Sequence, residues 1–188
     1  MITGFDYTAV VLCGGQGSRM GGADKGLLVW QGKPLVDHVI DQLKAQSVVP
    51  TRILISANRN LDFYRHRATV FTDVKPGYEG PLRGIQVALR QCNSPYLLVV
   101  PCDSPLLFPT LAQDLYEQGA GLAAYATVGA TDHPLICLLP QACLISLESY
   151  LDANRRRVKS WLAEMRATAV KFSDHSEFLN LNSPDLLA

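Results

Sequence analysis

The feature that most constrains the fold of this chain is a short apolar run that ends abruptly in glycines. Residues 8–12 are apolar and rich in β-branched side chains, and Gly14 and Gly15 follow almost at once. A buried parallel strand typically meets its following loop in this way. Beyond the loop, apolar residues recur at helical spacing over 35–43, and we expect Pro34 in the first turn of that helix. The chain is therefore predicted to open with a strand, a long glycine loop and a helix.

The same alternation continues along the chain. Further strands are predicted at 52–57, 68–72, 96–100, 122–127, 134–139, 169–172 and 178–181. Further helices are predicted at 61–66, 82–91, from Pro109 to about 118, at 141–151 and up to about 166. Strands that alternate with helices favour right-handed crossovers and a parallel sheet. We therefore predict an α/β, three-layer Rossmann-like fold, with a mainly parallel central sheet and helices on both faces.

Length and composition indicate one domain. The chain has 188 residues, of which 48% are hydrophobic and 18% charged, enough apolar material for a single core. We expect residues 1–188 to form this domain, with a nucleotide-binding part over about 1–110. The part over about 111–188 is less regular in pattern, and we expect it to face a second substrate.

Charge and cysteine content narrow the class of protein further. Acidic and basic residues balance at 17 each, so net charge encodes no attraction to nucleic acid or to a membrane. The chain shows neither a secretory signal nor an apolar run of membrane-spanning length, so we expect a cytoplasmic protein. Its five cysteines lack metal-ligand or C-x-x-C spacing, which favours buried, reduced thiols.

The glycine-rich segment 14–25 carries the first chemical signal. It holds five glycines together with Arg19 and Lys25, so its backbone N–H groups can converge on an anion while the two cations neutralise phosphate oxygens. It is not a Walker loop, because Lys25 follows Asp24 rather than glycine. Nor is it a dinucleotide fingerprint, because Met20 stands where a glycine is needed. The alternative is a mobile glycine loop with incidental charges.

Asp103 carries the second signal. It follows the most apolar predicted strand and stands between Pro101 and Pro105. A carboxylate at the carboxyl end of a strand, facing a phosphate loop, is the type of ligand that Mg²⁺ shared with a triphosphate requires. The alternative is that Asp103 or Ser104 caps a following helix.

Two further polar residues follow neighbouring strands. Asn58 and Asp73 come after the predicted strands 52–57 and 68–72, so both are expected at the same edge of the sheet. Each can bind a base or ribose, and a turn role is equally compatible with either residue. Gly80 and Gly84 flank the predicted start of a helix, a place that attracts anions.

The remaining polar clusters leave their roles open. The run 155–157 consists of three arginines and reads as a solvated turn or as a site for an anionic second substrate. His133, which precedes a proline, is expected to be structural. No serine, histidine and aspartate arrangement indicates a nucleophilic triad.

The motifs together resemble a known family. Residues 12–25 read Leu-Cys-Gly-Gly-x-x-x-Arg-Met-Gly-Gly-x-Asp-Lys, which resembles nucleotidyltransferases and, in its ending, the molybdenum cofactor guanylyltransferases. Further matching motifs follow in the expected order over nearly the whole chain: Gly80-Pro81-Leu82-x-Gly84, 101–105, 132–134, 156–158 and 180–184.

The resemblance implies an activity and a set of roles. The family transfers GMP from GTP to molybdopterin or Mo-molybdopterin with Mg²⁺, forming molybdopterin guanine dinucleotide and pyrophosphate. Proteins that insert molybdenum or mature molybdoenzymes are implied as partners. The implied catalytic residues are Arg19, Lys25 and Asp103, with Asp103 on the metal. The implied nucleotide-binding residues are Leu12, Cys13, Gly14, Gly15, Lys25, Ser56, Asn58, Asp73 and Asp103. The implied molybdopterin region holds Gly22, Gly80, Gly84, Arg156, Arg157, Asn180 and Asn182.

The chain departs from the family pattern at two positions. Cys13 replaces the usual alanine, a small apolar exchange, and Ser56 replaces the first asparagine of an Asn-Ala-Asn run. Two other classes of function fit the same residues. One is a cytidylyltransferase or sugar-phosphate nucleotidyltransferase on the same scaffold, and the other is a nucleotide-binding carrier without chemistry.

Overall fold

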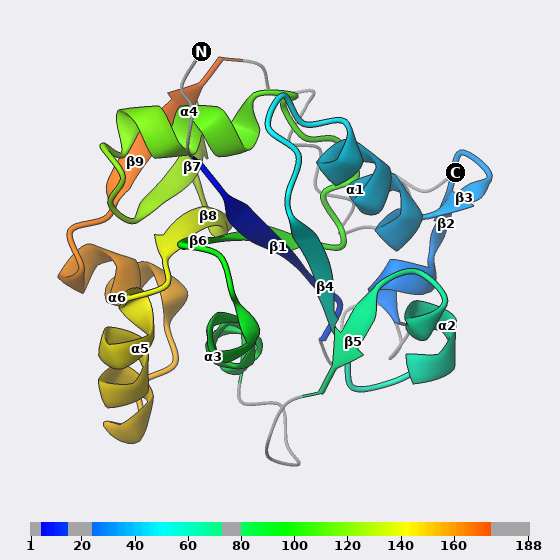
Figure 1. Cartoon of the computed structure of the whole chain (residues 1–188), viewed down its shortest axis with the longest axis horizontal. Coiled ribbons are helices and arrows are strands. Elements are labelled where there is room, and N and C mark those ends of the chain that lie inside the picture. The colour runs from blue at the N-terminus through cyan, green and yellow to red at the C-terminus, as the bar shows by residue number, and fades with distance from the viewer. Residues whose placement is uncertain (1–4, 15–23, 73–79, 174–188) are drawn as a thin grey trace.

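One central sheet organises the molecule (Figure 1). The computed structural model describes residues 5–14, 24–72 and 80–173. Within them, seven strands lie in the order β5-β4-β1-β6-β8-β7-β9. Their bounds are β1 (Tyr7–Leu12), β4 (Arg52–Ser56), β5 (Thr69–Phe71), β6 (Tyr96–Pro101), β7 (Ala124–Val128), β8 (Thr131–Pro140) and β9 (Thr168–Phe172). Only β8 pairs antiparallel with its neighbours in this sheet, so the prediction of a mainly parallel sheet is confirmed.

Helices cover both faces of this sheet, which confirms the three-layer α/β prediction (Figure 1). One face packs against α1 (Leu35–Lys44) and α4 (Leu111–Gln118), and α2 (Leu61–Arg65) contributes Tyr64 to the same core. The other face packs against α3 (Pro81–Gln91), α5 (Cys143–Asp152) and α6 (Val158–Glu164).

The burial of strand β1 on both faces explains why its sequence is mostly apolar. Tyr7, Ala9 and Val11 contact the layer of α1 and α4, whereas Val10 and Leu12 contact the layer of α3. Successive side chains of a strand point to opposite faces, so a strand covered on both faces needs an uninterrupted apolar run. All six residues of β1 are buried.

The segment before α1 contains elements that the sequence did not predict. A 3₁₀ turn, η2 (Lys25–Leu27), leads into a small hairpin of β2 (Val29–Trp30) and β3 (Lys33–Pro34). Gln31 and Gly32 both have positive φ, as a two-residue hairpin turn requires. Pro34 therefore pairs in β3 and precedes α1 rather than lying in its first turn. Strands of two residues are too short to give a periodic signal.

Strand β8 differs most from its predicted form. It begins at Thr131 rather than 134, and its pairing with β7 jumps from Tyr125↔Cys137 to Ala126↔His133. Residues 134–136 are therefore extra residues on β8, an irregularity that bends the strand. Because pairing with β6 ends at Val99↔Cys137, β8 leaves β6 before β6 ends. The predicted strand at 178–181 lies outside the described residues.

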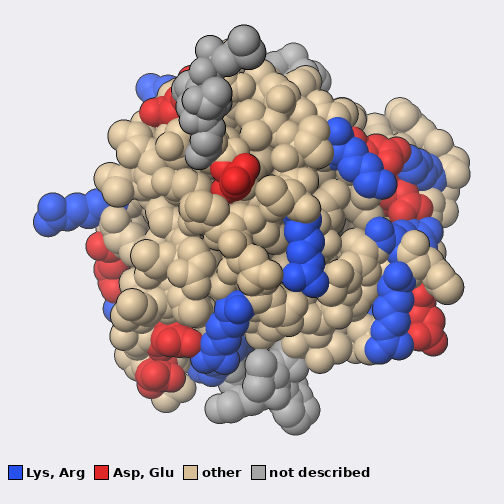
Figure 2. All heavy atoms as spheres, in the orientation of Figure 1, with Lys and Arg blue, Asp and Glu red and all other residues tan. Residues whose placement is uncertain are grey.

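The thiols and the surface agree with the composition. All five cysteines are free, and four of them are buried while Cys143 is partly exposed. On the face shown in Figure 2, acidic and basic side chains are interspersed over a surface that is mostly uncharged. In the part of the chain that the structure describes, no helix has the length and apolar character needed to cross a bilayer.

Candidate active site

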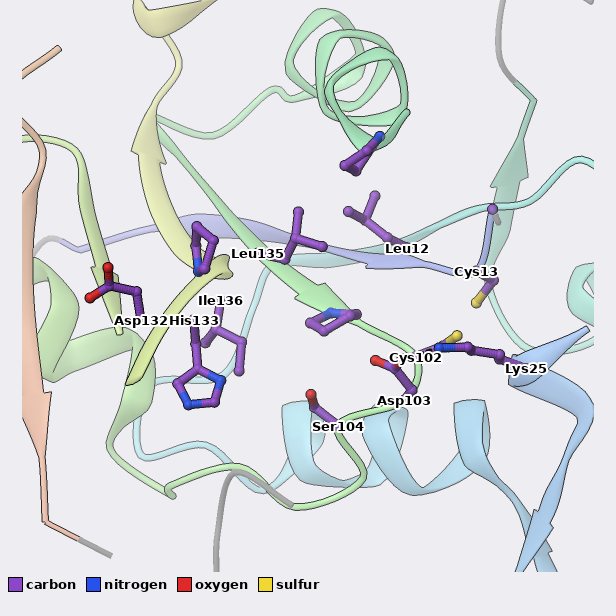
Figure 3. Close-up of a pocket in the computed structure, with 14 residues that line it drawn as sticks. Leu12, Cys13, Lys25, Cys102, Asp103, Ser104, Asp132, His133, Leu135 and Ile136 are labelled. Carbon is purple, nitrogen blue, oxygen red and sulfur yellow. Dashed lines mark hydrogen bonds and ion pairs between the residues drawn. The ribbon is translucent and has the colours of Figure 1, made fainter. Parts of the chain in front are cut away.

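A cavity of about 380 Å³ opens where β1 and β6 end (Figure 3). Ligands of open α/β sheets bind at the carboxyl ends of the parallel strands. The cavity is wide here because β8 has separated from β6, so that the irregular start of β8 forms the opposite wall. The lining residues are Leu12, Cys13, Gly14, Lys25, Pro81, Pro101, Cys102, Asp103, Ser104, Asp132, His133, Pro134, Leu135 and Ile136.

Strand register brings three chain segments together at this edge. Leu12 pairs with Ser56 on one side and with Pro101 on the other. The amide of Cys13 donates to the carbonyl of Ser56 at 2.8 Å, and the amide of Cys102 donates to the carbonyl of Leu12 at 3.1 Å. The residues that follow β1, β4 and β6 are therefore held side by side, as predicted from the parallel sheet.

Lys25 and Asp103 meet across the cavity. The Lys25 ammonium lies 2.9 Å from Asp103 Oδ2, and their side chains are 28% and 12% exposed. Figure 3 shows the two side chains approaching each other, with Cys13 and Cys102 nearby. The amide of Ser104 donates to the Pro101 carbonyl at 3.4 Å. The next helix after β6 is α4, which begins only at Leu111. The alternative in which Asp103 or Ser104 caps a following helix is therefore wrong.

The end of β4 lies beside Gly14. A Cβ placed on Gly14 would lie 3.6 Å from Asn58 Nδ2 and 3.9 Å from the Ser56 carbonyl oxygen. Ser56 is buried, and a Cβ on Gly84 would lie only 2.7 Å from Ser56 Oγ. Gly84 therefore lets α3 approach the end of β4 closely. Gly80, with φ of 84°, starts α3 beside the cavity-lining Pro81.

Two thiols lie at the base of the cavity. Burial, followed by the neighbouring Cys102 thiol, raises the pKa of Cys13 well above its ordinary value. A neutral thiol at this place is a small apolar group, which fits the exchange of alanine for cysteine at position 13. Chemistry at this site therefore depends on other side chains.

The wall formed by β8 was only partly anticipated. Asp132 and His133 line the cavity together with Pro134, although the sequence indicated a structural role for His133. Asp132 Oδ2 lies 2.5 Å from the Lys159 ammonium on α6. This ion pair connects the β8 wall to α6. The ordered motif at 132–134 was the signal that pointed to this wall.

The three arginines lie at the turn between α5 and α6. Arg155 pairs with Glu164 and lies 4.2 Å over the Tyr150 ring. Arg156 donates to the Leu151 carbonyl at 2.8 Å, and Arg157 is exposed. None of the three is among the described residues that line the cavity. The remaining predicted site residues, Gly15, Arg19, Gly22, Asp73, Asn180 and Asn182, lie outside the described residues.

The donor set of the cavity suits a hard divalent metal ion that is shared with a phosphate ligand. The described residues hold no cluster of three or more histidine, cysteine or acidic side chains, so they offer no closed protein cage. Asp103 instead presents one largely buried carboxylate to the cavity. Mg²⁺ is typically held by one or two carboxylates, waters and substrate phosphates, and this arrangement fits that mode.

Comparison with known proteins places these features in one family. Residues 9–169 match the MobA-like NTP transferase domain. The chain is 40% identical to a molybdenum cofactor guanylyltransferase of Cupriavidus metallidurans, over 100% of this chain and 95% of that protein.

Solved structures share the fold. A molybdopterin-guanine dinucleotide biosynthesis protein A from Archaeoglobus fulgidus aligns with a TM-score of 0.71 at 23% identity, covering 96% of this chain and 94% of that one. A CMP:2-keto-3-deoxy-manno-octonic acid synthetase complexed with CTP aligns with a TM-score of 0.72 at 13% identity, covering 97% and 95%. The fold alone therefore does not select the base.

Proposed function

The chain belongs to the molybdenum cofactor guanylyltransferase family, and from that premise we propose that it transfers GMP from GTP to molybdopterin or Mo-molybdopterin. The products are molybdopterin guanine dinucleotide and pyrophosphate. The observation that carries the proposal is the Lys25–Asp103 pair, 2.9 Å apart in a cavity at the ends of the parallel strands. A carrier without chemistry has no need of a cation and a carboxylate facing the same space.

We assign the two substrates to opposite sides of the cavity. Leu12, Cys13 and Gly14 at the end of β1 line the half for GTP, and Ser56 and Asn58 at the end of β4 lie beside them. Resemblance to the family alone assigns Gly15, Arg19 and Asp73 to the nucleotide.

The molybdopterin half is formed by the start of β8 and the start of α3 at Gly80. The same resemblance alone assigns Gly22, Arg156, Arg157, Asn180 and Asn182 to molybdopterin, and within the described part of the chain neither arginine lines the cavity. Residues from 111 onward thus contribute mainly to the acceptor.

The reaction is a displacement at the α-phosphorus of GTP. A phosphate oxygen of molybdopterin forms a bond to that phosphorus, while the bond to the oxygen that bridges to the β-phosphorus breaks and pyrophosphate leaves with the electron pair. The protein contributes position and charge, since phosphoryl-type transfer needs little covalent participation. Lys25 reaches the cavity from η2 and stabilises negative charge that develops on the phosphate oxygens.

Asp103 is the residue that would hold Mg²⁺. When bound there, Mg²⁺ would supply positive charge against the triphosphate and the leaving pyrophosphate. Before substrate binds, Lys25 occupies the side of Asp103 that carries Oδ2. The ion pair thus holds the carboxylate in place at the cavity.

Nucleotide choice gives the experiment that tests this function. Pyrophosphate release is measured with GTP and with CTP, each with and without molybdopterin, in the presence of Mg²⁺. We expect release only with GTP and molybdopterin together. Faster release with CTP would assign the chain to the cytidylyltransferases of this fold, and GTP binding without release would assign it to the carriers.

A further inference from the structure

The residue before Lys25 is held by an unusual number of donors. Asp24 Oδ1 accepts a hydrogen bond from the Tyr64 hydroxyl at 2.6 Å and another from the Gly26 amide at 3.2 Å. Asp24 Oδ2 accepts a third from Asn60 Nδ2 at 2.9 Å. One carboxylate thus joins η2 to α2 and to Asn60, the residue that precedes α2, across 36 to 40 residues of sequence.

Tyr64 is built into the core beneath η2. Its side chain is fully buried. Burial, then the nearby Cys13 and then Asp24 raise the pKa of Tyr64 above its ordinary value, so the hydroxyl keeps its proton and donates to Asp24. Hydrogen bonds to an ionised acceptor are about twice as strong as neutral ones.

Gly26, the residue after Lys25, lies against the ring of Tyr64 as well. A Cβ on Gly26 would lie 2.4 Å from the Tyr64 hydroxyl oxygen and 3.2 Å from Cζ. Only glycine fits there, so η2 lies directly against the ring. Lys25 therefore stands between two residues that both contact Tyr64.

This arrangement fixes the backbone from which Lys25 reaches the cavity. A lysine side chain has many rotamers, and holding its backbone reduces the freedom lost when the ammonium meets a phosphate. Accurate placement of the Lys25 ammonium can raise the catalytic rate by a large factor, since a small displacement of a charged group weakens its effect on the transition state. From η2 the Lys25 ammonium lies 2.9 Å from Asp103, which follows the carboxyl end of β6.

We propose that Tyr64 and Asn60 are positioning residues that act through Asp24 to present Lys25 to the triphosphate. The inference rests on the proposed function, because it concerns the same phosphate site. A purely structural role would make Tyr64 and Asn60 matter for folding alone. The proposed role makes them matter for turnover and nucleotide affinity, and only while Lys25 is present.

The test compares two buried tyrosines. Tyr64→Phe removes the hydroxyl that holds Asp24. The matched control is Tyr7→Phe, because Tyr7 is also fully buried and donates at 2.6 Å, but to the Val48 carbonyl at the other end of β1. Both variants lose one buried hydrogen bond. We expect Tyr64→Phe to lower kcat about tenfold, and Tyr7→Phe to keep it within about twofold of the parent.

A double-mutant cycle shows whether Tyr64 acts through Lys25. In a Lys25→Ala background, Tyr64→Phe should change kcat by less than about twofold. Asn60→Gly is the second variant, since Asn60 has a φ of 50° that glycine adopts freely. It removes the amide from an exposed position, so the fold is retained, and we expect kcat to fall about threefold.

The same cycle on GTP affinity, measured by titration calorimetry, needs no turnover. We expect Tyr64→Phe to weaken GTP binding about fivefold in the parent and not in Lys25→Ala. Equal losses in both backgrounds, or a parent-like Tyr64→Phe, would overturn the positioning role. A parent protein that binds GTP without forming product would contradict the proposed function instead, and the affinity cycle would still decide the role of Tyr64.

Discussion

The contact between α3 and β4 offers a perturbation whose size follows from the structure. A Cβ on Gly84 would lie 2.7 Å from Ser56 Oγ, 3.3 Å from Leu12 Cδ2 and 3.5 Å from Ser56 Cβ. The first distance is a clash with a short, buried side chain, whereas the other two approach ordinary contact. Gly84→Ala should therefore force Ser56 or the helix to move, and Ser56→Ala should remove the obstacle.

The magnitude comes from two opposing effects. Overpacking of a well-packed site costs about 1–3 kcal/mol, whereas alanine in place of glycine inside a helix stabilises by about 0.5–1 kcal/mol. Gly84→Ala alone should thus lower the free energy of unfolding by about 0–2.5 kcal/mol. In the Ser56→Ala background the same change should be neutral or stabilising by up to about 1 kcal/mol. The coupling between the two positions should equal the relieved overpacking cost, about 1–3 kcal/mol.

Urea unfolding of the parent, both single variants and the double variant measures this coupling. The slope of the free energy against urea should stay constant across the set, since each change alters the folded state locally. A coupling near zero, with Gly84→Ala equally costly in both backgrounds, would refute the assigned contact and with it the close approach of α3 to the end of β4.

Three further predictions follow from the site and the core. Asp103→Ala should abolish turnover and leave the circular dichroism spectrum unchanged, and Lys25→Ala should lower pyrophosphate release at least about tenfold; full activity in either variant would remove that residue from the mechanism. Burial raises the pKa of Cys143 from 9.0 to about 11 and raises that of Cys137 as well. The folded state keeps these protons while the unfolded chain releases them, so the free energy of unfolding should fall as the pH rises above about 9; urea titrations on both sides of this pH that give equal values would contradict this. Trp161 is fully buried and its indole donates to Ser146 Oγ at 3.2 Å. Trp161→Ala should therefore lower the free energy of unfolding in urea by about 3–5 kcal/mol. A decrease below about 1 kcal/mol would show that Trp161 does not anchor α6.

The nucleotide edge of the site could be predicted from the sequence because parallel strands align their carboxyl ends. Knowing that residues 8–12 and 96–100 form buried strands is enough to bring Gly14 and Asp103 to one edge. Lys25 was identified by its charge and by its place at the end of the glycine segment. The family resemblance added the base and the acceptor, which no spacing rule provides.

Other parts of the site depend on contacts that leave no local signal. The irregular start of β8 arises from its register with β7, so residues 134–136 read as an ordinary strand until the pairing is known. Tyr64 lies 40 residues from Asp24 on a five-residue helix, and nothing in its neighbourhood distinguishes it from any buried aromatic residue. The requirement for glycine at position 26 likewise follows only from the Tyr64 ring packed against it.

The central claim is that the α-phosphorus of GTP moves to molybdopterin. The most direct measurement uses GTP radiolabelled either at the α-phosphorus or at the γ-phosphorus, incubated with the purified chain, Mg²⁺ and molybdopterin. We predict that the α-label appears in a dinucleotide that contains guanine and the pterin, and that the γ-label appears in pyrophosphate. Recovery of the α-label only in GTP or in free GMP would contradict the account.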